Sequence, residues 1–544
     1  MSQSYAYRFT DAARRDRPRR LRVVGIALLL TVAIGAAAAW HPLAIVAAHN
    51  SVTILGPSAT SFDPAVQADA GSAQVVSQLF ESLTFVDSAA TVQPALAASW
   101  EIQNGGTRVV FHLRSGLEFS DGSALKASDV VASWMRVLSP AKPSQLASLL
   151  DGVTGATAYR EGTGPASGVG IRAKSDADVE VDMSSAASDF PAIVSSSTLA
   201  VVPSGIDSDS SLLRPGTFVG SGAYVLKALT KTETTLAANS HYWAGAPAIA
   251  TVHLLSSASA NGRVQDFQSG DLDYTPIADG DATWIAYDKI LGPSLRVEPS
   301  PSVEYYGFNT ARAPFNDVHV RRAFELGIDW KRIVTLMSPA GRVPATGMVP
   351  LGVPGHSATD YGPVFDLATA KSELSAAGFP DGAGFPKVLL ITTGGDFGQL
   401  EGAIVRQLHD NLGIDISYRA EDWDLYNAQL LSDAPAFWEM DWVADYPGAN
   451  DFLGLLLGSG QPNNFARWTN SDFDAAIKSA LSSTDAASMQ KAFDSAQSIV
   501  KDQAPVIPVS YGSGYSLVAK GLLGAMPNSQ GLVRYAGMSW ASGS

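Results

Sequence analysis

The sequence predicts a soluble α/β body with a mostly parallel sheet, built in at least two lobes, behind an N-terminal targeting segment. The chain has 544 residues, which is too many for one ordinary hydrophobic core. Its hydrophobic content of 46% and its charged content of 16% are typical of a well-packed globular protein. Strand-like and helix-like patterns alternate between residues 387 and 443, as in parallel α/β sheets.

The first 48 residues contain a basic segment followed by an apolar run. Arginines cluster within Arg14–Arg22, and the stretch Val23–Trp40 that follows is uncharged. A positive flank before an apolar run predicts that the rest of the chain lies outside the cytoplasm. Two outcomes stay open, because Val46–Ala48 resembles a signal-peptide cleavage site, while the apolar run is also long enough for an uncleaved membrane anchor.

Composition excludes several classes of function. The chain carries 52 Asp and Glu against 37 Lys and Arg, and such an acidic protein repels phosphate backbones, so we expect no nucleic acid partner. It has no cysteine, which excludes disulfides, thiolate metal sites and a cysteine-linked lipoprotein. P-loop, zinc-protease and nucleophile-elbow motifs are absent, and the 8 histidines lack metal-ligand spacing. We therefore expect no enzymatic activity, no metal and no cofactor.

The first half of the chain contains one strand and one helix with clear patterns. Arg108–Leu113 has the composition of a β-strand, and Ser128–Leu138 has apolar residues at helical spacing. Ser128 is the expected N-cap of this helix. Asp121-Gly122, between the two elements, marks a turn.

In the second half, strands and helices alternate regularly. The expected elements are, in order, a strand at Lys387–Thr393, a helix ending at Gly413, a strand at Ile414–Tyr418, a helix at Asp422–Leu431 and a strand at Ala436–Val443. The residues expected to share one face of the first helix are Leu400, Ile404, Leu408 and Leu412. This order predicts parallel strands.

The last of these strands leads into the segment WVADY, which is a candidate binding site. Ligands of open α/β sheets bind outside the carboxyl ends of the strands, so Asp445 is placed to meet one. Trp438, Met440 and Trp442 share one face of the strand. A carboxylate beside indoles suits an ammonium group. The alternative is a tryptophan-rich core strand followed by a turn, since indoles at strand spacing more often lie in a core.

Several longer motifs occur in the order found in one family. They are SFDPA (Ser61–Ala65), QLFESL (Gln78–Leu83), the run from Pro94 to Trp134, GSGAYVL (Gly220–Leu226), NSHYWAGAP (Asn239–Pro247), the run from Tyr306 to Asp329, and AKSELSAAGFPDG (Ala370–Gly382). With these motifs, the chain resembles the family 5 extracellular solute-binding proteins, which are peptide-binding components of ABC importers. The resemblance covers about residues 51 to 515.

The resemblance implies a two-lobed, periplasmic-binding-protein-like fold whose lobes close on a ligand about a hinge. It also implies the three domains of this family. Domain I would be discontinuous and consist of residues 49–85, 200–305 and 505–544. Domain II would cover residues 86–199, and domain III would cover residues 306–504.

The resemblance assigns a role to the WVADY segment. In oligopeptide-binding members, such a segment supplies the aspartate that pairs with the α-amino group of the peptide, so Asp445 takes this role and Trp442 lines a side-chain pocket. Glu439 stands where relatives often carry a basic residue, which disfavours a pocket for the peptide carboxylate and favours neutral or cationic peptides. Further peptide contacts are expected from Trp438, Tyr446, Tyr305, Tyr306, Asn309 and Asn464.

The function that the resemblance implies is the capture of short peptides and their delivery to ABC permease subunits with cytoplasmic ATPases. The body would be monomeric and extracytoplasmic. It would be held at the membrane by an uncleaved N-terminal helix, or secreted or periplasmic after signal cleavage. The alternative is a family member that binds another solute or has a regulatory role at the cell envelope, because one fold serves several ligands.

Overall fold

The computed structural model describes residues 50–67, 69–142, 144–206, 213–337, 342–393, 398–528 and 530–542. The predicted signal peptide or anchor over residues 1–48 lies outside these ranges. Residues 50–544 form one compact unit. No helix in the described part of the chain has both the length and the hydropathy needed to cross a membrane.

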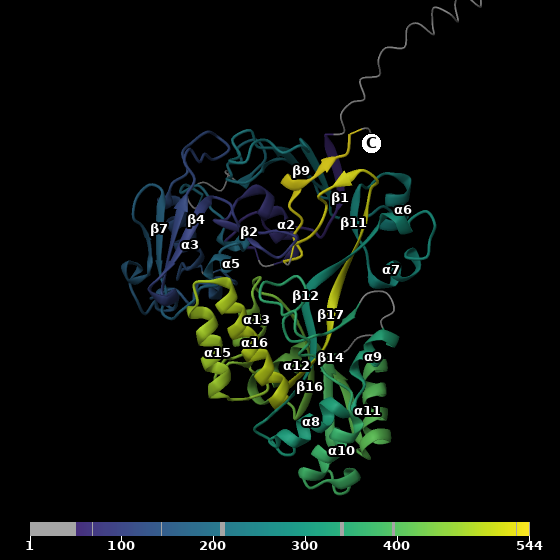
Figure 1. The fold of residues 1–544 in the computed structure, drawn as a ribbon. Helices are drawn as coiled ribbons and strands as arrows, with labels where there is room; N and C mark the ends of the chain where they lie inside the picture. Colours follow the sequence, from purple (N-terminus) through teal and green to yellow (C-terminus); the bar gives the residue numbers. More distant parts are fainter. Residues whose placement is uncertain are drawn as a thin grey trace, which may run out of the picture. The chain divides into compact units, whose positions relative to one another are not determined.

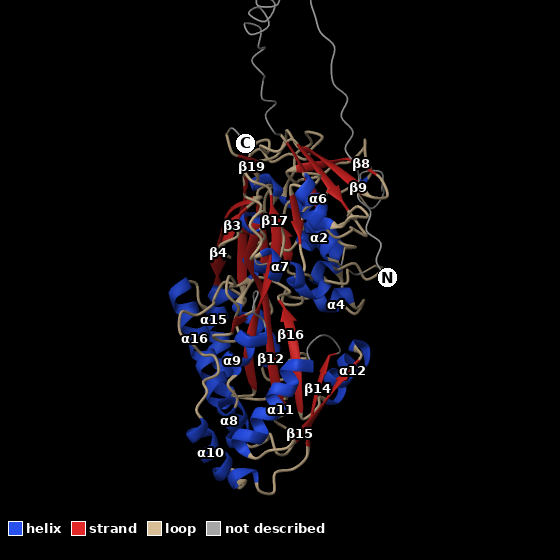
Figure 2. Ribbon diagram, turned by 90° about the vertical axis from the view of Figure 1, so that its right-hand side faces the viewer, coloured by secondary structure: helices blue, strands red, loops and turns tan. Residues whose placement is uncertain are grey.

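A mixed sheet, with 11 strands among the described residues, forms the centre of this unit (Figure 1). Its spatial order is β15 (Ile416–Glu421), β14 (Val388–Thr393), β16 (Phe437–Val443), β12 (Leu295–Phe308), β17 (Val506–Val518), β11 (Tyr274–Pro276), β1 (Ser51–Leu55), β10 (Thr251–Leu255), β9 (Glu233–Ala238) and β8 (Tyr224–Leu229), and β13 (Val343–Pro344) pairs with β17. The long strands β12 and β17 pair with each other and join two groups of elements (Figures 1 and 2).

The predicted alternation of strands and helices in the second half is confirmed. The elements β14, α11 (Gly398–Leu412), β15, α12 (Trp423–Asp433) and β16 follow one another along the chain. Strand β14 pairs parallel with both β15 and β16. The apolar face of α11 is buried at Leu400, Ile404, Leu408 and Leu412. Gly413 follows the helix at a φ of 68°, a left-handed conformation that favours glycine.

The prediction of a mostly parallel sheet is wrong for the sheet as a whole. Strand β12 pairs antiparallel with β16 and β17, and β17 pairs antiparallel with β11. The β12–β17 ladder joins residues far apart in the sequence, such as Tyr305 and Pro508. Periodicity within short windows identifies single elements and contains no signal for such distant pairing.

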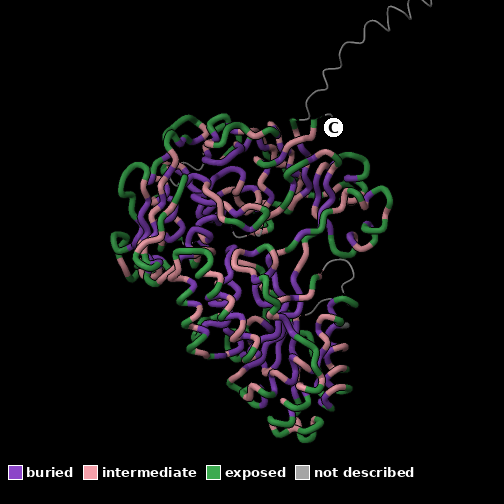
Figure 3. The backbone as a smooth tube through the Cα atoms, in the orientation of Figure 1, coloured by how far each residue is buried: buried purple, intermediate pink, exposed green. Residues whose placement is uncertain are grey.

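Helices cover both faces of the strands β12, β14 and β16. On one face, α8 (Val318–Gly327), α9 (Trp330–Met337), α10 (Leu367–Ala376) and α11 pack in one hydrophobic core with Tyr306 and Phe437. On the other face, Tyr305 and Trp438 pack with α12, α13 (Ala449–Phe452), α14 (Gly454–Leu457), α15 (Ser471–Ser482) and α16 (Ala486–Gln503). Figure 3 shows the buried residues gathered along these central strands.

A separate antiparallel sheet lies in the first half of the chain, and α3 (Ala127–Val137) packs against it through the buried Trp134. Its strands are, in spatial order, β4 (Ala97–Gln103), β5 (Arg108–Leu113), β7 (Asp178–Asp182) and β6 (Ile171–Ala173). The strand predicted at β5 and the helix predicted at α3 are both confirmed. The N-cap is Lys126 and not Ser128, because the Asp129 carboxylate in the first turn accepts a hydrogen bond of 2.8 Å from the Lys126 backbone N–H.

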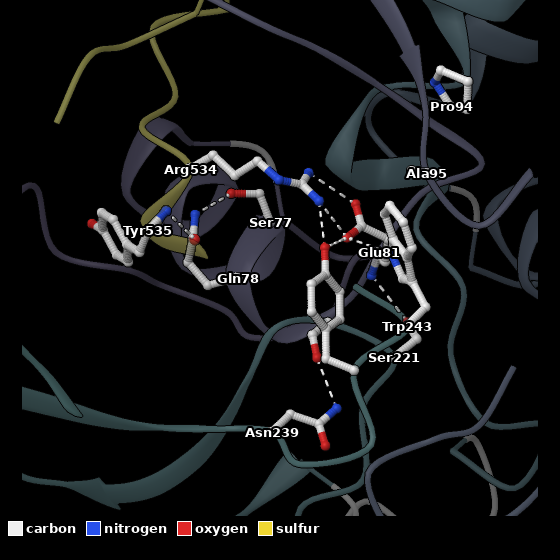
Figure 4. Close-up of polar contacts among 12 residues, drawn as sticks. Ser77, Gln78, Glu81, Pro94, Ala95, Ser221, Asn239, Trp243, Arg534 and Tyr535 are labelled. Carbon is white, nitrogen blue, oxygen red and sulfur yellow. Dashed lines mark hydrogen bonds and ion pairs between the residues drawn. The ribbon is translucent and has the colours of Figure 1, made fainter. Parts of the chain in front are cut away.

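Three segments distant in the sequence meet at Glu81, just after α2 (Ala70–Leu79) (Figure 4). The Arg534 guanidinium contacts both oxygens of the Glu81 carboxylate, at 3.1 and 2.8 Å. Tyr242 Oη and Trp243 Nε1 donate to the same carboxylate from a third segment. The contact joins the three pieces predicted for domain I, whose boundaries stay a prediction, as do those of domains II and III.

The shorter elements complete the described chain. They are β2 (Thr84–Val86), β3 (Val92–Pro94), α4 (Ala156–Arg160), α5 (Phe190–Ile193), α6 (Arg263–Ser269), α7 (Asp279–Ile285), β18 (Leu522–Leu523) and β19 (Ser539–Trp540).

Candidate functional site

A cavity of about 320 Å³ lies beside Asp445, where β16 ends. Segments from distant parts of the chain surround it, including the end of β1, the first turn of α2 and residues 530–535. Its volume falls in the range of about 300–1,000 Å³ that is typical of small-molecule sites. A second cavity, beside Glu81, measures about 40 Å³ and holds only water-sized molecules.

The lining of the larger cavity is acidic. Among the described residues that line it, Asp69 and Asp445 are the charged ones, and neither Lys nor Arg is present. Asp69 is engaged as the N-cap of α2, where its carboxylate accepts from the Ser72 backbone and from the Thr60 hydroxyl. Asp445 is the acidic group left to meet a ligand.

The Asp445 carboxylate is exposed to the cavity and has no hydrogen-bond or ion-pair partner within the described ranges. Many protein atoms surround the cavity, and this partial removal of water raises the pKa of Asp445. A cation that binds there would replace the lost solvation of the carboxylate. The arrangement therefore suits an ammonium or guanidinium group.

Asp451 fixes the backbone around Asp445, and sequence analysis did not identify it. Its side chain is fully buried, and Oδ2 accepts from Trp442 Nε1 at 2.9 Å and from the Asp445 backbone N–H at 3.2 Å. The other oxygen, Oδ1, is buried without a partner in the described part of the chain. Burial, with the nearby Asp445 carboxylate, raises the pKa of Asp451 well above its usual value. This buried acid brings Trp442 and Asp445 together.

The neighbouring Tyr446 links the end of β16 to the segment before α5. Its hydroxyl donates to Asp189 Oδ2 at 2.8 Å and accepts from Asn450 Nδ2 at 2.9 Å. Tyr446 is buried. It therefore supports the turn that carries Asp445.

Among the described residues, no strand pairs with the stretch of β16 next to Asp445 on the side away from β12. The Ala444 N–H donates to Pro301 O at 2.9 Å, in register with the β12–β16 ladder. In an antiparallel pair, every second residue directs its backbone groups at the partner strand, so those of Asp441 and Val443 point away from β12. Strand β14 pairs with β16 only at Phe437 and Trp438.

The residue before this open stretch has its backbone groups satisfied. The Glu439 N–H donates to Tyr426 Oη at 3.1 Å, and the same hydroxyl donates to Glu439 O. For Asp441 and Val443, no outward backbone hydrogen bond exists among the described residues. Unpaired strand edges of this kind can bind an extended chain.

The other predicted contacts lie in packed interiors. Trp438 is 1% exposed and contacts the rings of Tyr305 and Phe465, while Tyr306 packs against Trp330 and is fully buried. In this structure these aromatic residues are packing residues and do not line the cavity. Strand alternation groups side chains by face but does not reveal which face meets a ligand.

Both predicted asparagines also support the backbone. Asn309 Nδ2 donates to Ala434 O at 2.7 Å, and Asn464 Nδ2 donates to Leu457 O at 3.2 Å and to two further carbonyl groups. Each side chain is 3% exposed. Of the predicted contacts, only Asp445 lines the cavity among the described residues, while Trp442 and Tyr446 lie next to it and the other predicted contacts lie in packed interiors.

The described residues contain no group of three or more His, Asp or Glu that could hold a metal ion. Residues 91–464 match a family described as bacterial extracellular solute-binding proteins, family 5. Over 469 residues the chain is 30% identical to the probable deoxycholate-binding periplasmic protein YgiS of Escherichia coli, covering 83% of this chain and 86% of that protein. It is 25% identical over 464 residues to the oligopeptide-binding protein OppA of Bacillus subtilis, covering 83% and 85%.

Solved structures show the same fold. The unliganded open form of the murein tripeptide binding protein MppA matches with a TM-score of 0.83 at 24% identity, over 90% of this chain and 97% of that chain. Haemophilus influenzae OppA in complex with the peptide RPPGFSPFR matches with a TM-score of 0.65 at 23% identity, over 91% and 99%. The chain therefore has the mixed α/β fold of these periplasmic binding proteins.

Proposed function

Because this chain belongs to the bacterial extracellular solute-binding proteins of family 5, which are binding proteins and not enzymes, we propose that it captures short peptides and delivers them to an ABC permease. The proposal includes two lobes that close about β12 and β17 as a hinge.

The observation that carries the proposal is the Asp445 carboxylate, which has no partner among the described residues and lies beside an edge of β16 that no described strand covers. An extended peptide would add to this edge through backbone hydrogen bonds with Asp441 and Val443. Its α-amino group would pair with Asp445. With the amino end at Asp445, the peptide runs back along β16 and antiparallel to it. Backbone contacts of this kind do not depend on the side chains of the ligand, which suits a carrier of varied peptides.

Trp442 supports the same arrangement. Its indole N–H is held by Asp451, so the ring is fixed next to the proposed ammonium site. Partly buried indoles contribute apolar contact to a ligand side chain and attract cations through the ring face. The proposed role of Trp442 is therefore to line the pocket for the first side chains of the peptide.

A second candidate function is the transport of an anionic solute, because one relative is named a probable deoxycholate-binding protein and another a heme-binding protein. The cavity lining disfavours it. Two carboxylates and no base line the cavity within the described ranges, so the carboxylate of deoxycholate would be repelled. Peptides with a free amino group fit this charge better.

Titration calorimetry on the protein starting at Asn50 tests the proposal. Residues 50–544 are a compact unit with their own hydrophobic cores. We expect binding of free-amine peptides of three to five residues and no binding of deoxycholate. Native mass spectrometry should also detect copurified peptides. Tight binding of deoxycholate with no binding of any peptide would overturn the proposal.

A further inference from the structure

A second group of carboxylates lies around β16, apart from the cavity. This carboxylate cluster consists of Glu304, Glu401, Glu439 and Asp441. Glu304 on β12 pairs directly with Asp441 on β16, and Tyr306 pairs with Glu439, so these side chains share one face of the sheet. Glu401 reaches them from the first turn of α11. Glu304, Glu401 and Glu439 are 3%, 2% and 8% exposed, whereas Asp441 is exposed.

The charge of the carboxylate cluster is only partly balanced. Arg342 pairs with Glu304 at 2.5 Å, and the Ser510 hydroxyl donates to the same carboxylate at 2.6 Å. Glu439 has only long contacts with Thr393, at 3.4 and 3.5 Å. Among the described residues, the carboxylate cluster therefore has four acidic side chains and one basic partner, Arg342.

Unsatisfied polar atoms point to a missing partner. Both carboxylate oxygens of Glu401 and the hydroxyl of Tyr306 are buried, and neither group forms a hydrogen bond of normal geometry in the described part of the chain, although the Tyr306 hydroxyl lies close enough to Glu401 to act on its pKa. Leaving such groups unpaired destabilises a folded protein. A buried polar group of this kind is retained where a bound molecule completes its hydrogen bonds. A donor with several N–H groups would satisfy these acceptors.

We propose that the carboxylate cluster binds a basic side chain of the same peptide, a Lys ammonium or an Arg guanidinium, about four residues from the amino group held by Asp445. This inference rests on the proposed function. Asp445 and Asp441 are four residues apart, which spans about 14 Å along a strand. In a peptide that pairs with β16, successive side chains alternate between the two faces of the sheet. The side chain of the peptide residue beside Asp441 therefore points to one of these faces.

In the proposed complex, the basic side chain would approach the carboxylate cluster past Asp441. Asp441 is exposed and lies at the open stretch of β16, while Glu439 and Glu401 lie deeper. A long, flexible basic side chain can extend past Asp441 and place its charged end among the buried carboxylates. A short or acidic side chain cannot do so.

Proton release on binding distinguishes this inference from the proposed function. Burial raises the pKa of Glu439 to about 8 and that of Glu401 to about 7. The titratable groups that interact with Glu439 are Glu304, Tyr305 and Tyr306 from β12, Asp441 from β16, Glu401 from α11 and Tyr426 from α12, while Arg342, before β13, acts on Glu304 and Asp441. A bound cation favours the ionised carboxylates, so binding releases protons. Affinity for a basic peptide should rise between about pH 6 and pH 8.5.

Three peptides that differ at one position test the proposal: Ala-Ala-Ala-Lys-Ala, its norleucine analogue and its glutamate analogue. Titration calorimetry on the protein from Asn50 should give about a 10-fold or greater preference for lysine over norleucine, and weaker binding of glutamate. Titrations of the lysine peptide in two buffers with different ionisation enthalpies should reveal proton release, which the norleucine peptide should not show. Two further peptides carry the lysine at the third or the fifth position, and they test at which distance from the amino group the lysine is preferred.

Glu439→Gln should weaken binding of the lysine peptide more than binding of the norleucine peptide, and so abolish the preference for lysine. The variant is close to the protonated side chain in shape, so it should fold, and Asp441→Asn provides a second variant. Glu101→Gln is the matched control, because it removes one charge at an exposed site on β4. Equal affinity for lysine, norleucine and glutamate at all three positions would overturn the inference while the proposed function stands. No binding of any peptide would instead overturn the proposed function.

Discussion

Replacing Asp445 by asparagine removes the charge at the proposed ammonium site and keeps the shape of the side chain. No base among the described residues competes for this carboxylate, so the substitution should remove the whole attraction between it and the ligand. A hydrogen bond to a charged group contributes about 1.5–3 kcal/mol, and truncating one partner of a buried charge pair costs about 2–5 kcal/mol. Taking about 2 kcal/mol, we expect binding of a free-amine tripeptide to weaken about 30-fold.

A double-mutant cycle separates this contact from general damage. N-acetylation of the peptide should cost the wild-type protein about as much as Asp445→Asn does, because both changes remove the same interaction. In the variant, acetylation should add little. Titration calorimetry of both proteins with both peptides gives the four affinities, and Glu101→Gln serves as the control for a change in net charge.

Two results would refute the reasoning. One is full affinity of Asp445→Asn for free-amine peptides. The other is additivity, in which acetylation costs the variant as much as it costs the wild type. In either case the WVADY segment would be a core strand followed by a turn.

Substitutions at three further positions test the supporting structure. Asp451→Ala should weaken peptide binding and lower the free energy of unfolding by about 1–3 kcal/mol, because Trp442 Nε1 loses its acceptor; Asp451→Asn keeps an acceptor and should retain binding. Gly307→Ala should destabilise the protein by about 1–3 kcal/mol, since a Cβ there would lie 2.1 Å from the Trp438 ring. Glu81→Gln should cost about 2 kcal/mol or more, because Arg534 loses its counter-ion. Calorimetric titration measures binding, and urea unfolding measures stability.

Each of these expectations has a contradicting outcome. Wild-type affinity and stability in Asp451→Ala would show that the buried carboxylate does not hold the site. An unfolding free energy unchanged by Gly307→Ala would mean that the indole can move aside. For Glu81→Gln, an unchanged midpoint in urea would show that the contact with Arg534 contributes nothing measurable.

Local elements of this fold were predictable because their signals lie within short windows. Apolar residues recur every three to four positions on one face of α11. Gly413 ends the helix because its left-handed backbone conformation favours glycine. Asp445 could also be identified as a candidate from the sequence, because it follows the carboxyl end of a strand in an α/β block. Its position in the cavity lining agrees with that reasoning.

Other features depend on contacts between distant residues. Among the described residues, β14 pairs with only two residues of β16, and no pattern within β16 encodes how far its neighbour pairs with it. The predicted contacts Trp438, Tyr305 and Tyr306 are packing residues, since aromatic residues in strands look alike whether they face a core or a ligand. Asp451 was missed because a single acid after a turn is a common sequence feature.

The crystal structure of the protein with a bound free-amine peptide tests the central claim most directly. We predict an extended peptide along β16, with its ammonium nitrogen about 2.7–3.2 Å from the Asp445 carboxylate and with backbone hydrogen bonds to Asp441 and Val443. A ligand bound elsewhere, or a peptide whose carboxyl end lies at Asp445, would contradict the account.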